Sequence, residues 1–111
     1  MSSTSIRFLY VTTKDIEQAR SIAKTLIEER LAACANILPR MESIYRWEGT
    51  IQEEVECVLI LKTEAAKVAD ATKKIEELHS YQVPCVLSLT VESGASKYLD
   101  WLTTEVRTKS P

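Results

Sequence analysis

The chain has 111 residues, of which 45% are hydrophobic and 27% are charged. These values are typical of a globular domain with one hydrophobic core, and they exclude a disordered chain. The formal net charge is -2 and the pI is about 5.5, which argues against nucleic-acid binding. We therefore expect one domain over residues 1–111, with flexible ends at residues 1–5 and 108–111.

The sequence gives no sign of a targeting signal or a membrane segment. The polar start resembles no secretory leader, and the longest apolar run, Cys57 to Leu61, is too short to span a bilayer. Cys34, Cys57 and Cys85 are odd in number and widely separated, a pattern typical of reducing compartments. We expect free thiols, no membrane partner and a cytoplasmic location.

The first third of the chain predicts a strand, a helix and a second strand. Arg7 to Val11 is rich in aromatic and β-branched residues, which indicates a strand. Asp15 is a helix cap, and an apolar stripe at helical spacing extends to Leu31. The almost continuously apolar segment from Ala32 to Leu38 predicts a second strand that breaks at Pro39.

A long hairpin follows. Ser43 to Trp47 and Thr50 to Leu61 have strand character and are separated by the turn residues Glu48 and Gly49. Because these arms exceed the usual strand length of roughly 5 to 6 residues, part of the hairpin should protrude from the sheet. In its second arm, one face should carry Gln52, Glu54 and Glu56, and the other Ile51, Val55 and Cys57.

The last third predicts a helix, a strand and a final helix. The helix lies between Glu64 and Leu78, and the segment from His79 to Pro84 ends it. A fourth strand follows, with one buried face formed by Val83, Cys85, Leu87, Leu89 and Val91. The final helix runs from about Ser96 to Val106, with an apolar side formed by Tyr98, Leu99, Trp101 and Leu102.

This order predicts an α+β fold of the ferredoxin-like βαββαβ type with an extra C-terminal helix. Both internal helices should cover one face of an antiparallel sheet. The other face, including the side of the hairpin that carries Tyr45 and Trp47, should then meet another subunit. We expect a homo-oligomer.

Several segments, in order along nearly the whole chain, resemble the CutA family, which is named for divalent-cation tolerance. These segments are Glu28 to Ile37, Pro39, Ser43 to Gly49, Leu61 to Thr63, Leu78 to Tyr81 with Pro84, and Tyr98 to Leu102. One departure is Ser80, which stands where the family often has proline between the histidine and the tyrosine.

The resemblance implies a homotrimer similar in architecture to PII signalling proteins, whose long hairpins pair between neighbours. It also implies a role in tolerance of, or response to, divalent metal ions such as copper. It implies no catalytic reaction.

Metal ligands must come from one histidine, three cysteines and the carboxylates. Without a C-x-x-C or H-x-x-x-H pair, a dedicated zinc site within one subunit is not expected. Cu(II), or another divalent cation, is expected to bind weakly, with His79 and Cys34 as the candidate ligands. The plainer interpretations are a small buried side chain for Cys34 and a stabilised helix C-terminus for His79.

A second hypothesis is a PII-like signalling or scaffold trimer that binds a small anionic metabolite or a partner protein at the subunit cleft. The candidate cleft residues are Lys62, Tyr81, Trp47, Tyr45, Tyr98 and Trp101. The plainer interpretation makes Lys62 a strand-end charge that reaches solvent and the aromatic residues packing anchors.

Catalysis and RNA binding are not expected. Cys34 and His79 are the only nucleophile and base that could pair, and two glycines leave no phosphate loop. Arg7 to Tyr10 is a poor match to the exposed aromatic motif of RNA-binding sheets.

Overall fold

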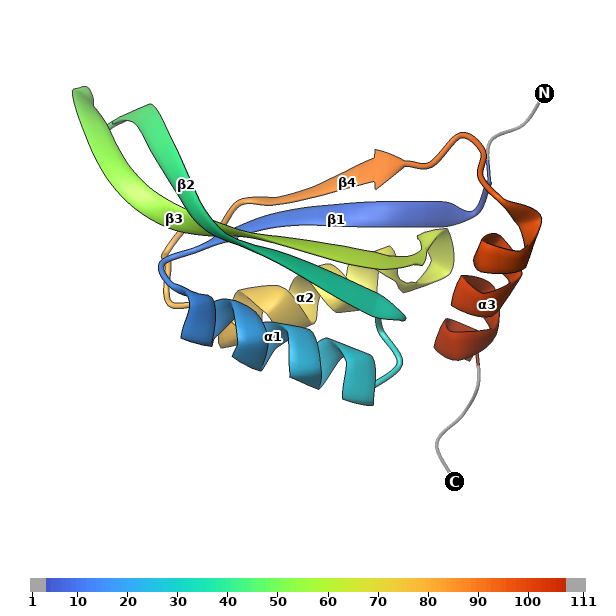
Figure 1. Cartoon of the computed structure of the whole chain (residues 1–111). Helices are drawn as coiled ribbons and strands as arrows, with labels where there is room; N and C mark the ends of the chain where they lie inside the picture. Colours follow the sequence, from blue (N-terminus) through green and yellow to red (C-terminus); the bar gives the residue numbers. More distant parts are fainter. Residues whose placement is uncertain (1–3, 108–111) are drawn as a thin grey trace.

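The computed structural model describes residues 4–107, which form a four-stranded antiparallel sheet and three α-helices (Figure 1). The sheet order is β2-β3-β1-β4. The elements in chain order are β1 (Ile6–Thr13), α1 (Ile16–Glu28), β2 (Cys34–Trp47), β3 (Thr50–Glu64), the short 3-10 helix η1 (Ala65–Lys67), α2 (Val68–Leu78), β4 (Val86–Thr90) and α3 (Ser96–Arg107).

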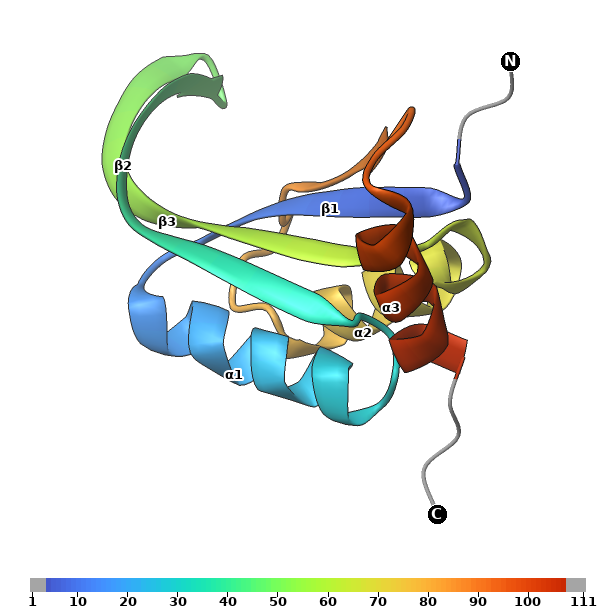
Figure 2. The ribbon, with the colours of Figure 1, turned by 45° about the vertical axis from the view of Figure 1, so that its right-hand side comes forward.

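The hydrophobic core lies between the sheet and the two helices α1 and α2, which cover the same face (Figures 1 and 2). Leu9 and Leu61 are paired neighbours on β1 and β3, and both are fully buried. Ile22 of α1 and Ile75 of α2 complete this layer. Helix α3 packs at the end of the sheet, where Leu102 is buried.

Local hydrogen bonds fix both ends of α1. The Asp15 carboxylate accepts from the backbone N–H of Gln18 at 2.8 Å, which confirms the predicted cap. The helix ends at Glu28 rather than continuing to Leu31, because Arg30 adopts a left-handed conformation with φ of 58°. The Arg30 guanidinium donates to the Glu105 carboxylate at 2.8 Å and so ties this turn to α3.

The predicted break at Pro39 is confirmed as an interruption of pairing with β3, although the strand itself does not end there. Strand β2 continues through Pro39 to Trp47, with a shift of register between Leu38 and Met41. A proline is tolerated here because β2 is an edge strand and the irregularity removes the need for its missing N–H. The irregularity lies at the base of the protruding hairpin.

The β2-β3 hairpin has the predicted turn. Trp47 pairs with Thr50 across Glu48 and Gly49, whose φ angles are 50° and 81°. Positive φ at both central residues is the geometry of the tight turn that matches strand twist. Figure 2 shows the hairpin curling away from the helices, over the face of the sheet that they leave open.

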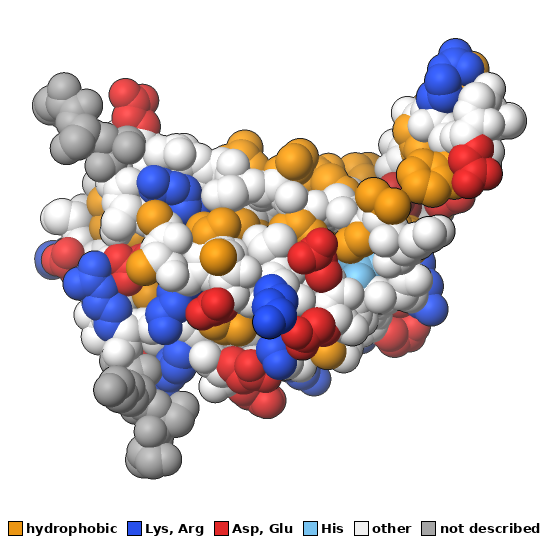
Figure 3. Space-filling model, turned by 180° about the vertical axis from the view of Figure 1, so that it is seen from behind, with side chains coloured by type: hydrophobic (Ala, Val, Ile, Leu, Met, Phe, Trp, Pro, Cys, Tyr) orange, Lys and Arg blue, Asp and Glu red, His pale blue; other side chains and the backbone are white. Residues whose placement is uncertain are grey.

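The predicted burial of β4 is wrong. Leu87 and Leu89 are 57% and 51% exposed, because they pair with Tyr10 and Phe8 on the open face of the sheet. Val86 packs against the core instead. In Figure 3, hydrophobic side chains gather along the upper side of the molecule and at the base of the hairpin.

The first described residues are tied to the sheet. The Thr4 hydroxyl donates to the Val91 carbonyl at 2.6 Å, and the Ser5 hydroxyl donates to Glu64 at 2.9 Å. The predicted flexibility of residues 1–3 and 108–111 lies outside the described residues. Within residues 4–107, no helix has both the length and the apolar character needed to cross a membrane.

Candidate functional site

A cavity of about 830 Å³ lies under the curled hairpin, and we call it the hairpin pocket. Its wall comes from the inner face of the hairpin, the end of β1 and the segment between α2 and β4. The lining residues are Tyr10, Thr12, Met41, Glu42, Ser43, Ile44, Tyr45, Trp47, Gln52, Glu54, Glu56, Tyr81, Gln82, Val83 and Cys85.

The hairpin register explains why acidic and aromatic side chains share this pocket. Tyr45 pairs with Gln52, and Met41 pairs with Glu56, so alternate residues of both arms project from the same face. The predicted grouping of Gln52, Glu54 and Glu56 on one face is therefore confirmed, and Tyr45 lies on that face too.

Glu56 and Tyr81 form the polar floor of the pocket. The Tyr81 hydroxyl donates to Oε2 of Glu56 at 2.8 Å. Glu56 is only 7% exposed, although it carries a carboxylate. No ion pair involves Glu56 among residues 4–107. Among the described residues, the carboxyl group of this floor is therefore partnered by a neutral hydroxyl rather than by a cation.

His79, which does not line the pocket itself, holds Tyr81 in place through a hydrogen bond and a ring contact. Its Nε2 lies 2.7 Å from the Thr12 carbonyl oxygen, and its Nδ1 accepts from the backbone N–H of Tyr81 at 3.1 Å. Because Nδ1 accepts, Nε2 carries the proton and donates to Thr12. The two rings pack with centroids 4.6 Å apart. Both nitrogens of this buried imidazole are therefore engaged.

The acidic side chains set the electrostatics of the pocket. Burial and the Glu56 carboxylate raise the pKa of Tyr81 well above its ordinary value of 10.0. Loss of hydration and a hydrogen bond to Glu54 raise the pKa of Tyr45. Burial, followed by the charge of Glu56, also raises the pKa of the Cys85 thiol. All three groups stay neutral at physiological pH.

The other predicted cleft residues form a separate group beside α3. The Lys62 ammonium donates to the Tyr98 hydroxyl at 3.1 Å and lies over the ring of Phe8, 5.5 Å from its centroid. The rings of Tyr98 and Trp101 pack 5.6 Å apart. The six candidates therefore split into two groups, one in the hairpin pocket and one around Lys62.

The structure does not bring the two candidate metal ligands together. Cys34 pairs with Lys62, which pairs with Phe8 on β1, whereas His79 bonds to Thr12. At 3.3 Å per residue, the two β1 positions lie about 13 Å apart. Among residues 4–107, no three His, Cys, Asp or Glu side chains are grouped so that they could hold a metal ion.

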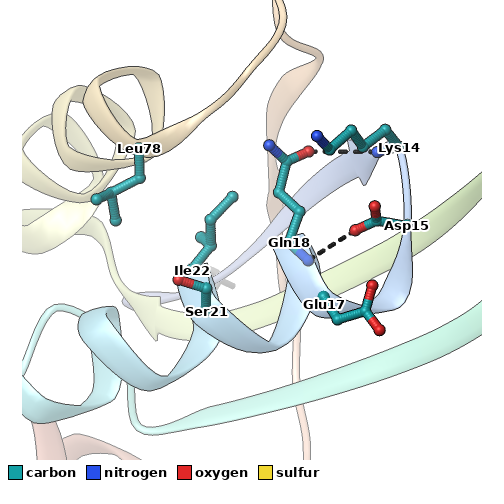
Figure 4. A pocket seen from close by; sticks show the side chains of 7 residues that line it. All are labelled: Lys14, Asp15, Glu17, Gln18, Ser21, Ile22 and Leu78. Atoms are coloured by element: carbon teal, nitrogen blue, oxygen red, sulfur yellow. Dashed lines mark hydrogen bonds between the residues drawn. The ribbon is translucent and has the colours of Figure 1, made fainter.

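A smaller cavity of about 330 Å³ lies between the start of α1 and the end of α2 (Figure 4). Asp15 and Gln18 are occupied there with the backbone N–H groups that begin α1. Two of the polar side chains of this cavity are therefore already engaged in fixing the start of α1. Its lining residues are Lys14, Asp15, Glu17, Gln18, Ser21, Ile22 and Leu78.

Sequence reasoning missed Glu56, Glu54 and Tyr10 as pocket residues. The tight turn at Gly49 could have revealed the two glutamates, because counting back from it fixes which residues face Tyr45. Tyr10 carries no such signal, since only the curl of the hairpin brings it to the same cavity.

Comparison with known proteins gives consistent matches. A model of the family described as CutA1 divalent ion tolerance protein matches residues 7–105. A Thermus thermophilus relative, "Divalent-cation tolerance protein CutA", is 45% identical over 92 residues, which cover 83% of this chain and 89% of the relative. The Arabidopsis thaliana relative, "Protein CutA, chloroplastic", is 39% identical over 99 residues, covering 89% of this chain but 54% of its own length.

A solved structure shows the same fold. The periplasmic divalent cation tolerance protein CutA from Archaeoglobus fulgidus has a TM-score of 0.89 and 37% identity, and the match covers 92% of this chain and 99% of that one. These names describe tolerance proteins rather than enzymes. They give no support to the signalling alternative.

The predicted cytoplasmic location is wrong. The similar CutA protein of Archaeoglobus fulgidus is described as periplasmic, and that of Arabidopsis thaliana as chloroplastic. Cys34, Cys57 and Cys85 are free in the structure, as predicted. Free thiols therefore do not identify the compartment of this protein. Cys57, for example, is buried with its thiol 3.0 Å from the Pro39 carbonyl oxygen, so its fold position keeps it unpaired.

Proposed function

This chain belongs to the CutA1 divalent ion tolerance family, and from that membership we propose that it contributes to tolerance of divalent metal ions, with copper among them. The observation that carries the proposal is the continuous family match over residues 7–105. A match of this extent includes the core, the long hairpin and α3 together. It therefore does not rest on one short motif.

The proposed working unit is a homotrimer of single-domain, ferredoxin-like subunits with PII-like architecture. Its support is apolar surface that one small subunit leaves exposed. On the open face of the sheet, Leu38 is 53% exposed and Leu89 is 51% exposed. On the outer face of the hairpin, Ile51 is 61% exposed and Val55 49%. Large apolar side chains exposed in this number are typical of subunit interfaces.

Sedimentation equilibrium tests the trimer directly. The wild-type protein should have three times the subunit mass, and Leu89→Glu should lower the mass by placing a charge in the interface. Thr90→Glu is the matched control, because the next residue of β4 projects from the opposite face. A wild-type monomer, or equal dissociation of both variants, contradicts the proposal.

The proposed metal interaction is weak binding of Cu(II), with His79 as a nitrogen ligand and Cys34 as the second candidate. Coordination at His79 Nδ1 must displace the backbone N–H of Tyr81. That displacement costs a hydrogen bond of about 1 kcal/mol and leaves a donor without a partner, so the affinity should be modest. Affinity should also fall in acid, because a metal and a proton compete for the imidazole.

Calorimetric titration with copper chloride tests this interaction. His79→Asn should weaken binding, while Cys34→Ser shows whether the thiol contributes. Circular dichroism of each variant confirms that it is folded. If all three proteins bind copper equally, neither residue is a ligand. That result would leave the proposed role in tolerance to be judged by cell growth.

A further inference from the structure

The β2-β3 hairpin leaves the body of the sheet at Cys57. Strand β1 pairs with β3 only as far as Thr13, which lies opposite Cys57. From Glu56 to Thr50, β3 pairs with β2 alone among the described residues. A two-stranded ribbon has little stability of its own, so the hairpin depends on what holds its base. Figures 1 and 2 show both arms bending away from β1 beyond this point.

A β-bulge lies opposite the same residue. The register of β2 against β3 shifts between Leu38 and Met41. Pro39 and Arg40 therefore stand opposite a single residue of β3, which is Cys57. Two residues against one is the arrangement of a β-bulge, which bends its strand and interrupts the ladder of hydrogen bonds. Pro39 weakens the ladder further, because it has no N–H. The hairpin therefore bends where its pairing with β1 ends.

The side chain of Cys57 joins the bulge to the hydrophobic core. It is 3% exposed and belongs to the core between the sheet and the helices. Its thiol donates to the Pro39 carbonyl oxygen, 3.0 Å from Sγ. A carbonyl displaced from the regular ladder needs such a partner, and the partner holds it in one orientation. A thiol is a weak donor, so this bond breaks at low cost.

Movement at the bulge would change the hairpin pocket. Tyr45 and Trp47 belong to the hairpin wall of the pocket, whereas Tyr81 and Cys85 belong to the wall formed by the body of the molecule. The two aromatic side chains of the hairpin wall are 39% and 43% exposed. Rotation of the hairpin about its base would therefore widen or narrow the pocket without unfolding either wall.

We propose that the hairpin is an arm that pivots at the Pro39–Arg40 bulge, and that the Cys57 thiol holds it in the curled position by its hydrogen bond to the Pro39 carbonyl. Only the backbone at the bulge must change between positions of the arm, as at other hinges. Loss of the thiol shifts the population toward less curled positions. This device is independent of the proposed metal interaction, because neither His79 nor Cys34 belongs to it.

Fluorine NMR of protein labelled with fluorotryptophan tests the pivot. The chain has two tryptophans, so Trp47 reports on the hairpin and Trp101 on α3. The variant Trp47→Phe identifies the hairpin signal. Cys57→Val removes the donor but keeps an apolar side chain of similar size in the core. It should shift or broaden the Trp47 signal and leave the Trp101 signal unchanged.

Hydrogen exchange measures the size of the effect. In Cys57→Val, exchange at the base of the hairpin, residues 40–43 and 55–58, should rise about fivefold, the effect of one lost hydrogen bond. Exchange in α2 should stay at the wild-type rate. Cys57→Ser keeps a donor opposite the carbonyl and should resemble the wild type in both measurements. All proteins are compared at one concentration, and sedimentation confirms that they have the same mass.

Two further variants separate the pivot from a general loss of stability. Leu59→Val changes the same buried face of β3 without touching the bulge, and it should leave the Trp47 signal in place. Cys57→Ala is a second variant without a donor, for use if the valine variant does not fold. The proposal is overturned if the donor-free variants match the wild type, if Cys57→Ser behaves as they do, or if Leu59→Val has the same effect.

Discussion

Replacement of His79 by alanine is the most informative test of how the pocket is held in shape. The imidazole joins the Thr12 carbonyl to the backbone N–H of Tyr81, and its ring packs on the Tyr81 ring. Each hydrogen bond contributes about 1 kcal/mol, and the ring contact contributes roughly 0.5 to 1.5 kcal/mol. His79→Ala should therefore lower the free energy of unfolding by roughly 3 kcal/mol.

Urea unfolding followed by circular dichroism measures this loss. Wild type and variant are compared at one protein concentration, because the stability of an oligomer depends on concentration. His79→Asn should lower the free energy of unfolding by less, since its amide can keep one of the two hydrogen bonds, to Thr12 or to Tyr81. Hydrogen exchange at the Tyr81 amide gives a local measurement, and this amide should be protected only in the wild type. A loss below about 1 kcal/mol, or a protected Tyr81 amide in His79→Ala, would refute this role.

Two further predictions concern charge and turn geometry. The Arg107 guanidinium donates two hydrogen bonds to Glu64 and lowers the pKa of that carboxyl below its ordinary value of 4.5. The stabilisation is therefore present above pH 4.5 and lost as pH falls through the folded-state pKa, so Glu64→Gln should flatten the acid limb of a stability–pH curve. Gly49→Ala should destabilise by about 1 kcal/mol through its positive φ alone. Gly94→Ala, where a new Cβ would lie 3.4 Å from Leu99, should cost less when both variants are compared with the wild type by thermal melting.

Local sequence signals predicted the elements that local interactions determine. The cap at Asp15 and the turn at Gly49 depend on residues a few positions apart, and the structure shows both. The end of α1 was placed too late, because Arg30 takes a left-handed conformation that an arginine does not signal. Its contact with Glu105, far along the chain, helps to hold that turn.

Burial of the sheet faces could not be predicted from alternation. Leu87 and Leu89 alternate correctly, but alternation shows only which residues share a face and not which face the helices cover. That choice follows from pairing with β1, where Leu87 is opposite Tyr10. Burial was therefore assigned to the wrong set of residues.

The hairpin pocket depends on contacts between segments that are distant in the chain, so the sequence predicts only some of its residues. Tyr45, Trp47 and Tyr81 were candidates because they are aromatic residues in segments resembling the family. The sequence pattern places Glu56 on a polar face of the hairpin but predicts no role for it. Its significance arises from burial against Tyr81, 25 positions away in the chain.

Growth of cells under metal stress tests the central claim most directly. A host that lacks its own CutA-type protein is grown over a copper series, with and without a plasmid that encodes this chain, and expression is checked by immunoblot. We predict that the plasmid raises the copper concentration that halves growth, and that Leu89→Glu reduces the effect while Thr90→Glu retains it. Equal sensitivity with and without the expressed wild-type chain, for copper and for other divalent ions, would contradict a role in divalent-ion tolerance.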